Sequence, residues 1–189
     1  MAFCDFPTIL LARRAMLVRS GAVLSGAAVA LLTGRDALAA KVANAAAGDV
    51  RILNTALSAE YEAIAAYQVG AESNLLQKPV LDIAVEFQGH HKQHAEVLAK
   101  TVQKLGGVPV TAKSAYDFPV ASLKTQADVL TFAATLERGA VSAYLGAVPL
   151  FASRDLAKAA ASILGDEAMH WAVLRQALGM TPVPTAFMA

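Results

Sequence analysis

Four stretches of the chain carry apolar residues at the spacing of an amphipathic α-helix, and no stretch shows the sustained alternation of a β-strand. The predicted helices cover residues 49–75, 79–105, 125–149 and 153–178. A few residues join the helices within each half, so each half is an antiparallel hairpin. About 18 residues separate the halves, enough to run the length of a ~25-residue helix. We therefore expect an all-α four-helix bundle with one long crossover.

The front of the chain has the pattern of an export signal. Arg13 and Arg14 precede an apolar run over residues 21–33, and residues 37–39 read Ala-Leu-Ala, a small-x-small cleavage pattern. The paired arginines resemble a twin-arginine signal, which exports proteins already folded. The alternative is an uncleaved membrane anchor, although the apolar run is short for a span of ~20 residues.

These boundaries divide the chain into four parts. A twin-arginine-type signal peptide covers residues 1–39, a flexible leader 40–48, the bundle 49–179 and a short proline-containing tail 180–189. The protein is then expected to be periplasmic or otherwise exported, with no stable membrane span after the signal is removed.

Composition narrows the function. A net charge of +1 disfavours a strong attraction to nucleic acid. The single cysteine, Cys4, lies before the predicted cleavage site, so the exported chain has no thiol. Any metal site in it must therefore use histidine and carboxylate ligands.

Each of the four apolar stripes is interrupted near its centre by ionisable residues. A lone carboxylate in a dry core costs several kcal/mol, so six such groups at similar depth indicate that something compensates their charge. Divalent cations do so. The candidate metal ligands are Glu60, His91, His94, Glu137, Glu167 and His170.

The spacing of these residues repeats between the two halves. Glu60 precedes His94 by 34 residues and Glu137 precedes His170 by 33. The pairs His91-x-x-His94 and Glu167-x-x-His170 have the i, i+3 spacing that places two side chains on one helical face. The halves therefore resemble two copies of one ligand-bearing hairpin.

Three stretches carry a resemblance to a known family: residues 53–67, residues 94–107 and the run Asp166-Glu167-Ala168-Met169-His170-Trp171. They resemble the first, second and fourth helices of bacterioferritins, and the chain as a whole is most similar to small exported bacterial proteins with a ferritin-like domain. The resemblance implies a ferritin-like bundle and a di-iron or di-manganese site. By it, Glu60, His94, Glu137, Glu167 and His170 would bind the metal.

One position departs from the family pattern. His91 stands where the family usually has the glutamate of the second helix's Glu-x-x-His. A neutral imidazole has one lone pair and cannot bridge two metals as a carboxylate does, and three carboxylates leave two divalent ions with a formal charge of +1. Four alternatives stay open: bridging by Glu167 or by hydroxide, a mononuclear site, a mixed-metal site, and a role for His91 beside the ligands.

The sequence gives weaker support for placing other polar residues in or beside the metal site. Tyr67 and Tyr144 each lie seven residues after a candidate glutamate, at a position from which a hydroxyl can hydrogen-bond a ligand carboxylate. His90 lies about 100° from the stripe and is expected at the surface. Three further glutamates also lie off the stripes and are expected to be solvated: Glu62, Glu86 and Glu96.

Three functions are compatible with this sequence. The first is an exported metal-binding protein with one or two iron or manganese ions, acting as a metal-dependent oxidoreductase in oxidative stress. The alternative is a non-catalytic envelope module that uses its bundle, with or without a structural metal, to bind a partner. The third is a metal-free bundle. A homodimer is left open, but no interface for a closed iron-storage shell is evident in the sequence.

Overall fold

The computed structural model describes residues 7–188, with side chains from residue 40 onward. The chain divides into two units, Met1–Asn44 and Ala45–Ala189, and helix α1 (Pro7–Glu72) belongs to both. Residues 40–48, expected as a flexible leader, are helical, which suits their alanine-rich sequence because alanine is the strongest helix former.

The predicted export signal falls on residues 1–39, whose side chains lie outside the described part of the structure. It stays a prediction. Among the described residues, no helix is both long and apolar enough to cross a membrane.

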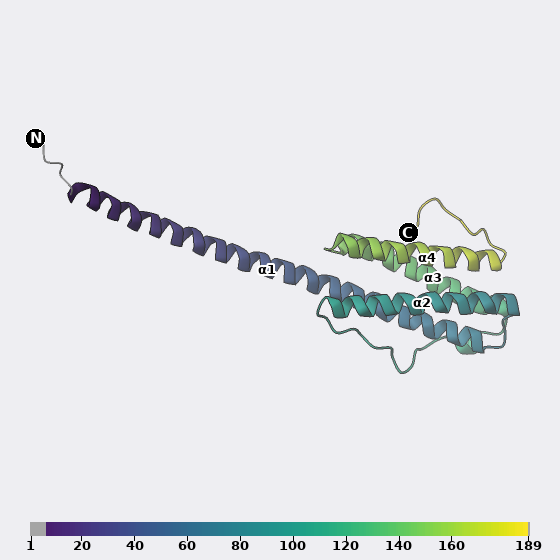
Figure 1. The fold of residues 1–189 in the computed structure, drawn as a ribbon. Helices are drawn as coiled ribbons and strands as arrows, with labels where there is room; N and C mark the ends of the chain where they lie inside the picture. The colour runs from purple at the N-terminus through teal and green to yellow at the C-terminus, as the bar shows by residue number, and fades with distance from the viewer. Residues whose placement is uncertain (1–6, 189) are drawn as a thin grey trace, which may run out of the picture. The chain divides into compact units, whose positions relative to one another are not determined.

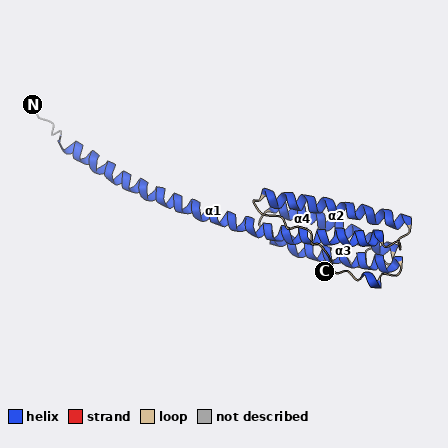
Figure 2. Cartoon of the chain, turned by 90° about the horizontal axis from the view of Figure 1, so that it is seen from below, coloured by secondary structure: helices blue, strands red, loops and turns tan. Residues whose placement is uncertain are grey.

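The second unit is a four-helix bundle, which confirms the predicted fold class. The last part of α1 is followed by α2 (Lys78–Lys104), α3 (Gln126–Ala147) and α4 (Arg154–Ala177). Two short 3₁₀ helices, η1 (Val120–Ser122) and η2 (Val148–Leu150), lie between them. Residues 7–188 contain no strand, and Figure 2 draws them as helices and loops alone.

The helix ends follow the sequence signals. Thr125 and Asp128 form a capping box at the start of α3, and Ser153 accepts a hydrogen bond from the backbone at the start of α4. Gly106 and Gly179 have φ angles of 78° and 71° just after α2 and α4, a conformation that favours glycine. These residues set the helix lengths and therefore the depth at which each ionisable side chain lies.

The crossover between α2 and α3 runs along the bundle from one end to the other (Figure 1). Asn54 of α1 fixes its first part, since the side-chain amide donates to the carbonyl of Val108 and accepts from the backbone N–H of Val110. Because the crossover returns the chain to the end where α2 began, α2 and α3 run in the same direction, as a bundle of two hairpins requires.

The apolar core consists of two clusters with the ionisable residues between them. One cluster contains Leu57, Leu98 and Ile163, and the other contains Phe87, Leu130 and Leu174. Along every helix of the bundle, the candidate ligands come after a residue of one cluster and before a residue of the other. The fold thus encloses a polar layer between two apolar layers.

Candidate metal centre

All six predicted ligands converge in the polar layer. Five of them are almost completely buried, with 0–3% of their surface exposed, and the side chain of His94 is 15% exposed. They come from four different helices: Glu60 from α1, His91 and His94 from α2, Glu137 from α3, and Glu167 and His170 from α4. Their close approach in the core therefore depends on the whole bundle.

The six residues form two overlapping groups, each able to hold a metal ion. The Glu60 group consists of Glu60, His91, His94 and Glu167. The Glu137 group consists of His91, Glu137, Glu167 and His170. Within each group, one ligand atom per residue lies within 4.8 Å of the others. His91 and Glu167 belong to both groups, so they occupy the position between two neighbouring metal sites.

Four buried polar atoms in the described side chains have no hydrogen-bond partner, and all four belong to these groups. They are Nδ1 of His94, Nδ1 of His170 and both carboxylate oxygens of Glu167. Nδ1 of His94 lies 3.1 Å from Oε1 of Glu167, and Nδ1 of His170 lies 3.4 Å from Oε2. Buried polar groups are nearly always hydrogen-bonded. Four such atoms that lack a hydrogen bond and lie close together are therefore suited to bind a metal ion as its ligand atoms.

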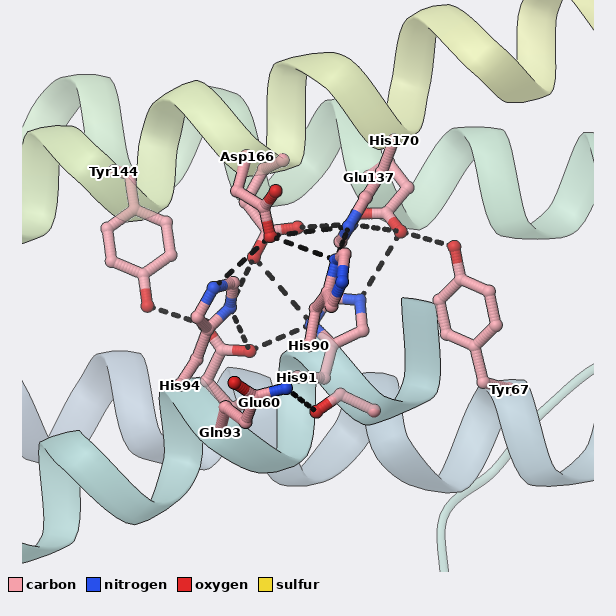
Figure 3. Close-up of polar contacts among 12 residues, drawn as sticks. Glu60, Tyr67, His90, His91, Gln93, His94, Glu137, Tyr144, Asp166 and His170 are labelled. Carbon is pink, nitrogen blue, oxygen red and sulfur yellow. Dashed lines mark hydrogen bonds and ion pairs between the residues drawn. The ribbon is translucent and has the colours of Figure 1, made fainter. Parts of the chain in front are cut away.

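Two tyrosines hydrogen-bond Glu60 and Glu137, the outer glutamates, from opposite ends of the centre (Figure 3). The hydroxyl of Tyr144 on α3 donates to Oε1 of Glu60 at 2.5 Å, and the hydroxyl of Tyr67 on α1 donates to Oε1 of Glu137. Each tyrosine therefore reaches the glutamate of the other helix. Each tyrosine thus follows one glutamate by seven residues in the sequence and hydrogen-bonds the other glutamate in the structure.

The charges of the metal-free site depend on these contacts. Burial alone would lower the pKa of His91, but the carboxylates of Glu137 and Glu60 raise that pKa to about 10. In the same way, burial is outweighed by carboxylates that raise the pKa of His94 and of His170 to about 9. Burial would raise the pKa of Glu60 and of Glu137, but the neighbouring imidazoles lower both. Without metal, protons therefore neutralise the site.

Asp166 is a site residue that the sequence analysis did not single out. Its Oδ2 lies 3.3 Å from Nε2 of His94 and 3.3 Å from Nε2 of His170. Since Oδ2 faces the outer nitrogen of both rings, Asp166 favours the tautomer that leaves each Nδ1 free to bind metal. A signal was present, because Asp166 precedes His170 by four residues and shares its helical face.

His90 was expected at the surface but lies partly inside the site. Its side chain is 34% exposed, and its Nδ1 lies 2.9 Å from Nε2 of His170 and 3.3 Å from Oδ2 of Asp166. These three residues form a third group of candidate metal ligands. The side chain keeps part of its exposure, as expected, but the contacts with α4 were not predicted from its angular position on α2.

A cavity of about 670 Å³ between α1 and α3 reaches the centre from the side of Glu60 and Glu137. Small residues form much of its wall, among them Ala59, Ala63 and Gly139. The cavity therefore reaches the candidate metal centre although its six predicted ligands are mostly buried.

The comparisons with known proteins agree with this fold. The family described as the ferritin-like domain matches residues 48–180, which is most of the chain and all of the bundle. The chain belongs to the ferritin-like domain family. A search of curated proteins finds no match for this family member.

Solved structures of similar proteins support the same fold. This ferritin-like protein is similar to a dodecameric thioferritin, a bacterioferritin-related protein of Bacteroides fragilis, with 26% identity, a TM-score of 0.62, and coverage of 71% of this chain and 86% of that chain.

Two further structures are less than 25% identical and so show the fold alone. One is a conserved hypothetical protein of Mycobacterium tuberculosis, with 20% identity, a TM-score of 0.64, and coverage of 70% of this chain and 98% of that chain. The other is a ferritin-like diiron-carboxylate protein of Bacillus anthracis, with 22% identity, a TM-score of 0.56, and coverage of 71% and 97%.

Proposed function

We propose that this protein binds two divalent metal ions, iron in the first place and manganese as the alternative, in the polar layer of its bundle. The observation that carries the proposal is the convergence of four unpaired buried atoms on the boundary between the Glu60 group and the Glu137 group. Protons neutralise the charge of the metal-free site. Metal ions would neutralise it as well and would bind the four atoms.

The residues of the chain have distinct roles in this proposal. Glu60 and His94 would hold one ion and Glu137 and His170 the other, with Glu167 belonging to both groups. Tyr67 and Tyr144 fix the orientation of the outer glutamates through their hydroxyl groups. Asp166 holds the outer nitrogens of His94 and His170, so that the inner nitrogens keep their lone pairs for the metal.

We further propose that the bound metal makes the protein an exported oxidoreductase that acts on oxygen or peroxide in oxidative stress. Iron or manganese held by histidine and carboxylate ligands supplies one-electron chemistry when a coordination position is open. The cavity between α1 and α3 supports this role, since it provides a route for a small oxidant to reach Glu60 and Glu137. A twin-arginine signal would allow metal loading before export.

The test is elemental analysis of the protein purified from its native compartment, with metal counted per chain. Two equivalents of iron or manganese are expected. The matched variants are Glu167→Gln, which removes the charge shared by both groups, and Glu86→Gln, which makes the same change at an exposed position on α2. Glu167→Gln is expected to lose metal, and Glu86→Gln to keep it.

Three results would contradict parts of this proposal. A folded protein that contains no metal and refuses added metal would refute metal binding. One equivalent would indicate a mononuclear site. Two equivalents without turnover of oxygen or peroxide would favour the non-catalytic envelope module, with the metal stabilising the bundle.

A further inference from the structure

A third group of candidate ligands lies between α2 and α4, at the edge of the metal centre. This outer group consists of His90, Asp166 and His170. The side chains of His90 and Asp166 are 34% and 23% exposed, whereas that of His170 is 2% exposed. The outer group therefore connects the surface of the bundle with the buried centre.

The three residues of the outer group bring one atom each close together (Figure 3). Oδ2 of Asp166 lies 3.3 Å from Nδ1 of His90 and 3.3 Å from Nε2 of His170, and the two nitrogens lie 2.9 Å apart. Ligand atoms about 2.1 Å from one ion lie roughly 3.0 Å apart at octahedral angles and roughly 3.4 Å apart at tetrahedral angles. All three separations lie within or next to this range, so the outer group can receive one ion from solution.

His170 belongs to both the outer group and the Glu137 group, and it serves them with different nitrogens. Its Nε2 faces Asp166 and His90. Its Nδ1 lies 3.4 Å from Oε1 of Glu137 and 3.4 Å from Oε2 of Glu167. A neutral imidazole has one lone pair, so His170 binds an ion through one nitrogen at a time. The two groups therefore hold ions in succession.

The carboxylates favour movement of the ion inward. The outer group has one carboxylate, that of Asp166, whereas the Glu137 group has two, those of Glu137 and Glu167. A site with more carboxylate ligands holds a divalent ion more tightly. Once the ion has moved to Nδ1 of His170, a proton on Nε2 can again be held by Asp166. The outer group is thus the weaker site, suited to passing an ion on.

The cavity between α1 and α3 is a poorer route for a cation. Alanine, glycine and other apolar residues form most of its wall, and its described lining includes no residue of the outer group. A hydrated ion that enters an apolar passage loses water without gaining ligands, which is costly. The outer group instead offers ligands from the surface inward.

We propose that His90 and Asp166, together with Nε2 of His170, form the loading site through which a divalent metal ion enters the centre. The inference rests on the proposed metal-binding function. The ion exchanges its bond to Nε2 of His170 for a bond to Nδ1, and the one proton of the neutral ring changes nitrogen in the opposite direction. This ligand exchange changes no oxidation state.

Uptake and release of cobalt(II) by the full, metal-free protein test the loading site without any activity measurement. Cobalt(II) changes its visible absorption when histidine and carboxylate ligands replace water, so stopped-flow mixing gives the uptake rate and excess chelator gives the release rate. We expect His90→Gln to slow both rates by about tenfold, which corresponds to about 1.4 kcal/mol in the barrier. Because an entry route is also the exit route, the affinity and the number of bound ions should stay unchanged.

Three further variants complete the comparison. Asp166→Asn removes the carboxylate of the outer group and should slow uptake by about tenfold or more, since a negative entrance attracts cations. Glu86→Gln removes a charge at an exposed position on α2 outside all three groups, and Ala143→Leu narrows the cavity between α1 and α3. Both should leave the uptake rate unchanged.

The outcomes separate the loading site from the proposed function. If cobalt binds, unchanged uptake in either folded variant of the outer group, or slower uptake in Ala143→Leu, would refute the loading site and leave metal binding intact. Faster release with unchanged uptake in His90→Gln would show that His90 only supports His170, which also refutes it. A third ion bound beside a full centre would overturn the succession of the two groups. A folded protein that binds no cobalt would refute both proposals.

Discussion

The metal-free protein should lose stability as the pH rises from 6 to 8. His91, with a pKa of about 10, and His94 and His170, with a pKa of about 9, bind protons more tightly in the folded protein than in the unfolded chain. A histidine in the unfolded chain has a pKa of about 6.5. Below that value both states are protonated and the stabilisation is complete. Above it the unfolded state releases its protons first, so folding becomes less favourable.

The magnitude follows from the distance between the pH and the unfolded pKa. At pH 8, about 1.5 units above 6.5, each fully protonated folded histidine has lost about 2 kcal/mol of stabilisation relative to pH 5.5. The three rings share three carboxylates, so their contributions are coupled and the total lies between about 2 and 6 kcal/mol. On the acidic side, the lowered pKa of Glu60 and of Glu137 means that their contribution is lost as the pH falls below about 4.5.

Urea denaturation of the metal-free protein at a series of pH values measures this dependence. We expect the free energy of unfolding to be greatest near pH 5–6.5 and to fall by about 2 kcal/mol or more at pH 8. In His91→Gln the loss per pH unit above 7 should be smaller by about 1.4 kcal/mol, because one proton fewer is bound. A metal-free protein whose stability is constant or rises from pH 6 to 8 would show that the core histidines are not protonated, and the reasoning would fail.

Four further substitutions test individual contacts of the bundle, each by urea denaturation. Tyr144→Phe removes a hydroxyl that donates to a buried carboxylate and should cost about 1.5–3 kcal/mol. Asp49→Ala removes a buried carboxylate that accepts backbone N–H groups just before α4, at 2.8 and 3.1 Å, and should cost about 1–3 kcal/mol. Gly107→Ala should destabilise the protein because its Cβ would lie 2.7 Å from a valine methyl, whereas Gly89→Ala meets nothing within 4 Å on α2 and should stabilise it by about 0.5–1 kcal/mol. Equal effects of the two glycine substitutions would contradict the packing described for Gly107.

The fold could be predicted from the sequence because local signals and periodicity agree. The capping box at Thr125, the cap at Ser153 and the glycines after α2 and α4 each act within one turn of a helix, so they are readable without tertiary information. The extension of α1 before Asp49 was not predicted. Signal-peptide composition and helix propensity overlap in an alanine-rich segment, and the pattern was interpreted as an export signal followed by a leader.

The six core residues could be predicted because each is an ionisable residue at a helical position where the periodicity calls for an apolar one. Their tyrosine neighbours carried a weaker signal, the repeated seven-residue spacing, which does not show which glutamate each hydroxyl meets. His90 lies off the stripe of α2, so only the packing of α2 against α4 reveals its contact with His170. The i, i+4 spacing of Asp166 and His170 could be read from the sequence, whereas the contact of Asp166 with His94 on α2 could not. Residues whose role depends on contact between helices are the ones that sequence periodicity misses.

The two hairpins carry matching site residues except at one pair of positions, His91 and Glu167. Exchanging the halves pairs Glu60 with Glu137, Tyr67 with Tyr144, and His94 with His170, and each member meets the same kind of partner as its counterpart. The same exchange pairs His91 with Glu167, the two residues shared by both groups, so the symmetry is broken at the bridging position. At this position the second hairpin supplies a carboxylate and the first hairpin an imidazole, which carries no negative charge when neutral. The metal-free site therefore sets three histidines against three carboxylates, and its pH response depends on the protonation of all three rings.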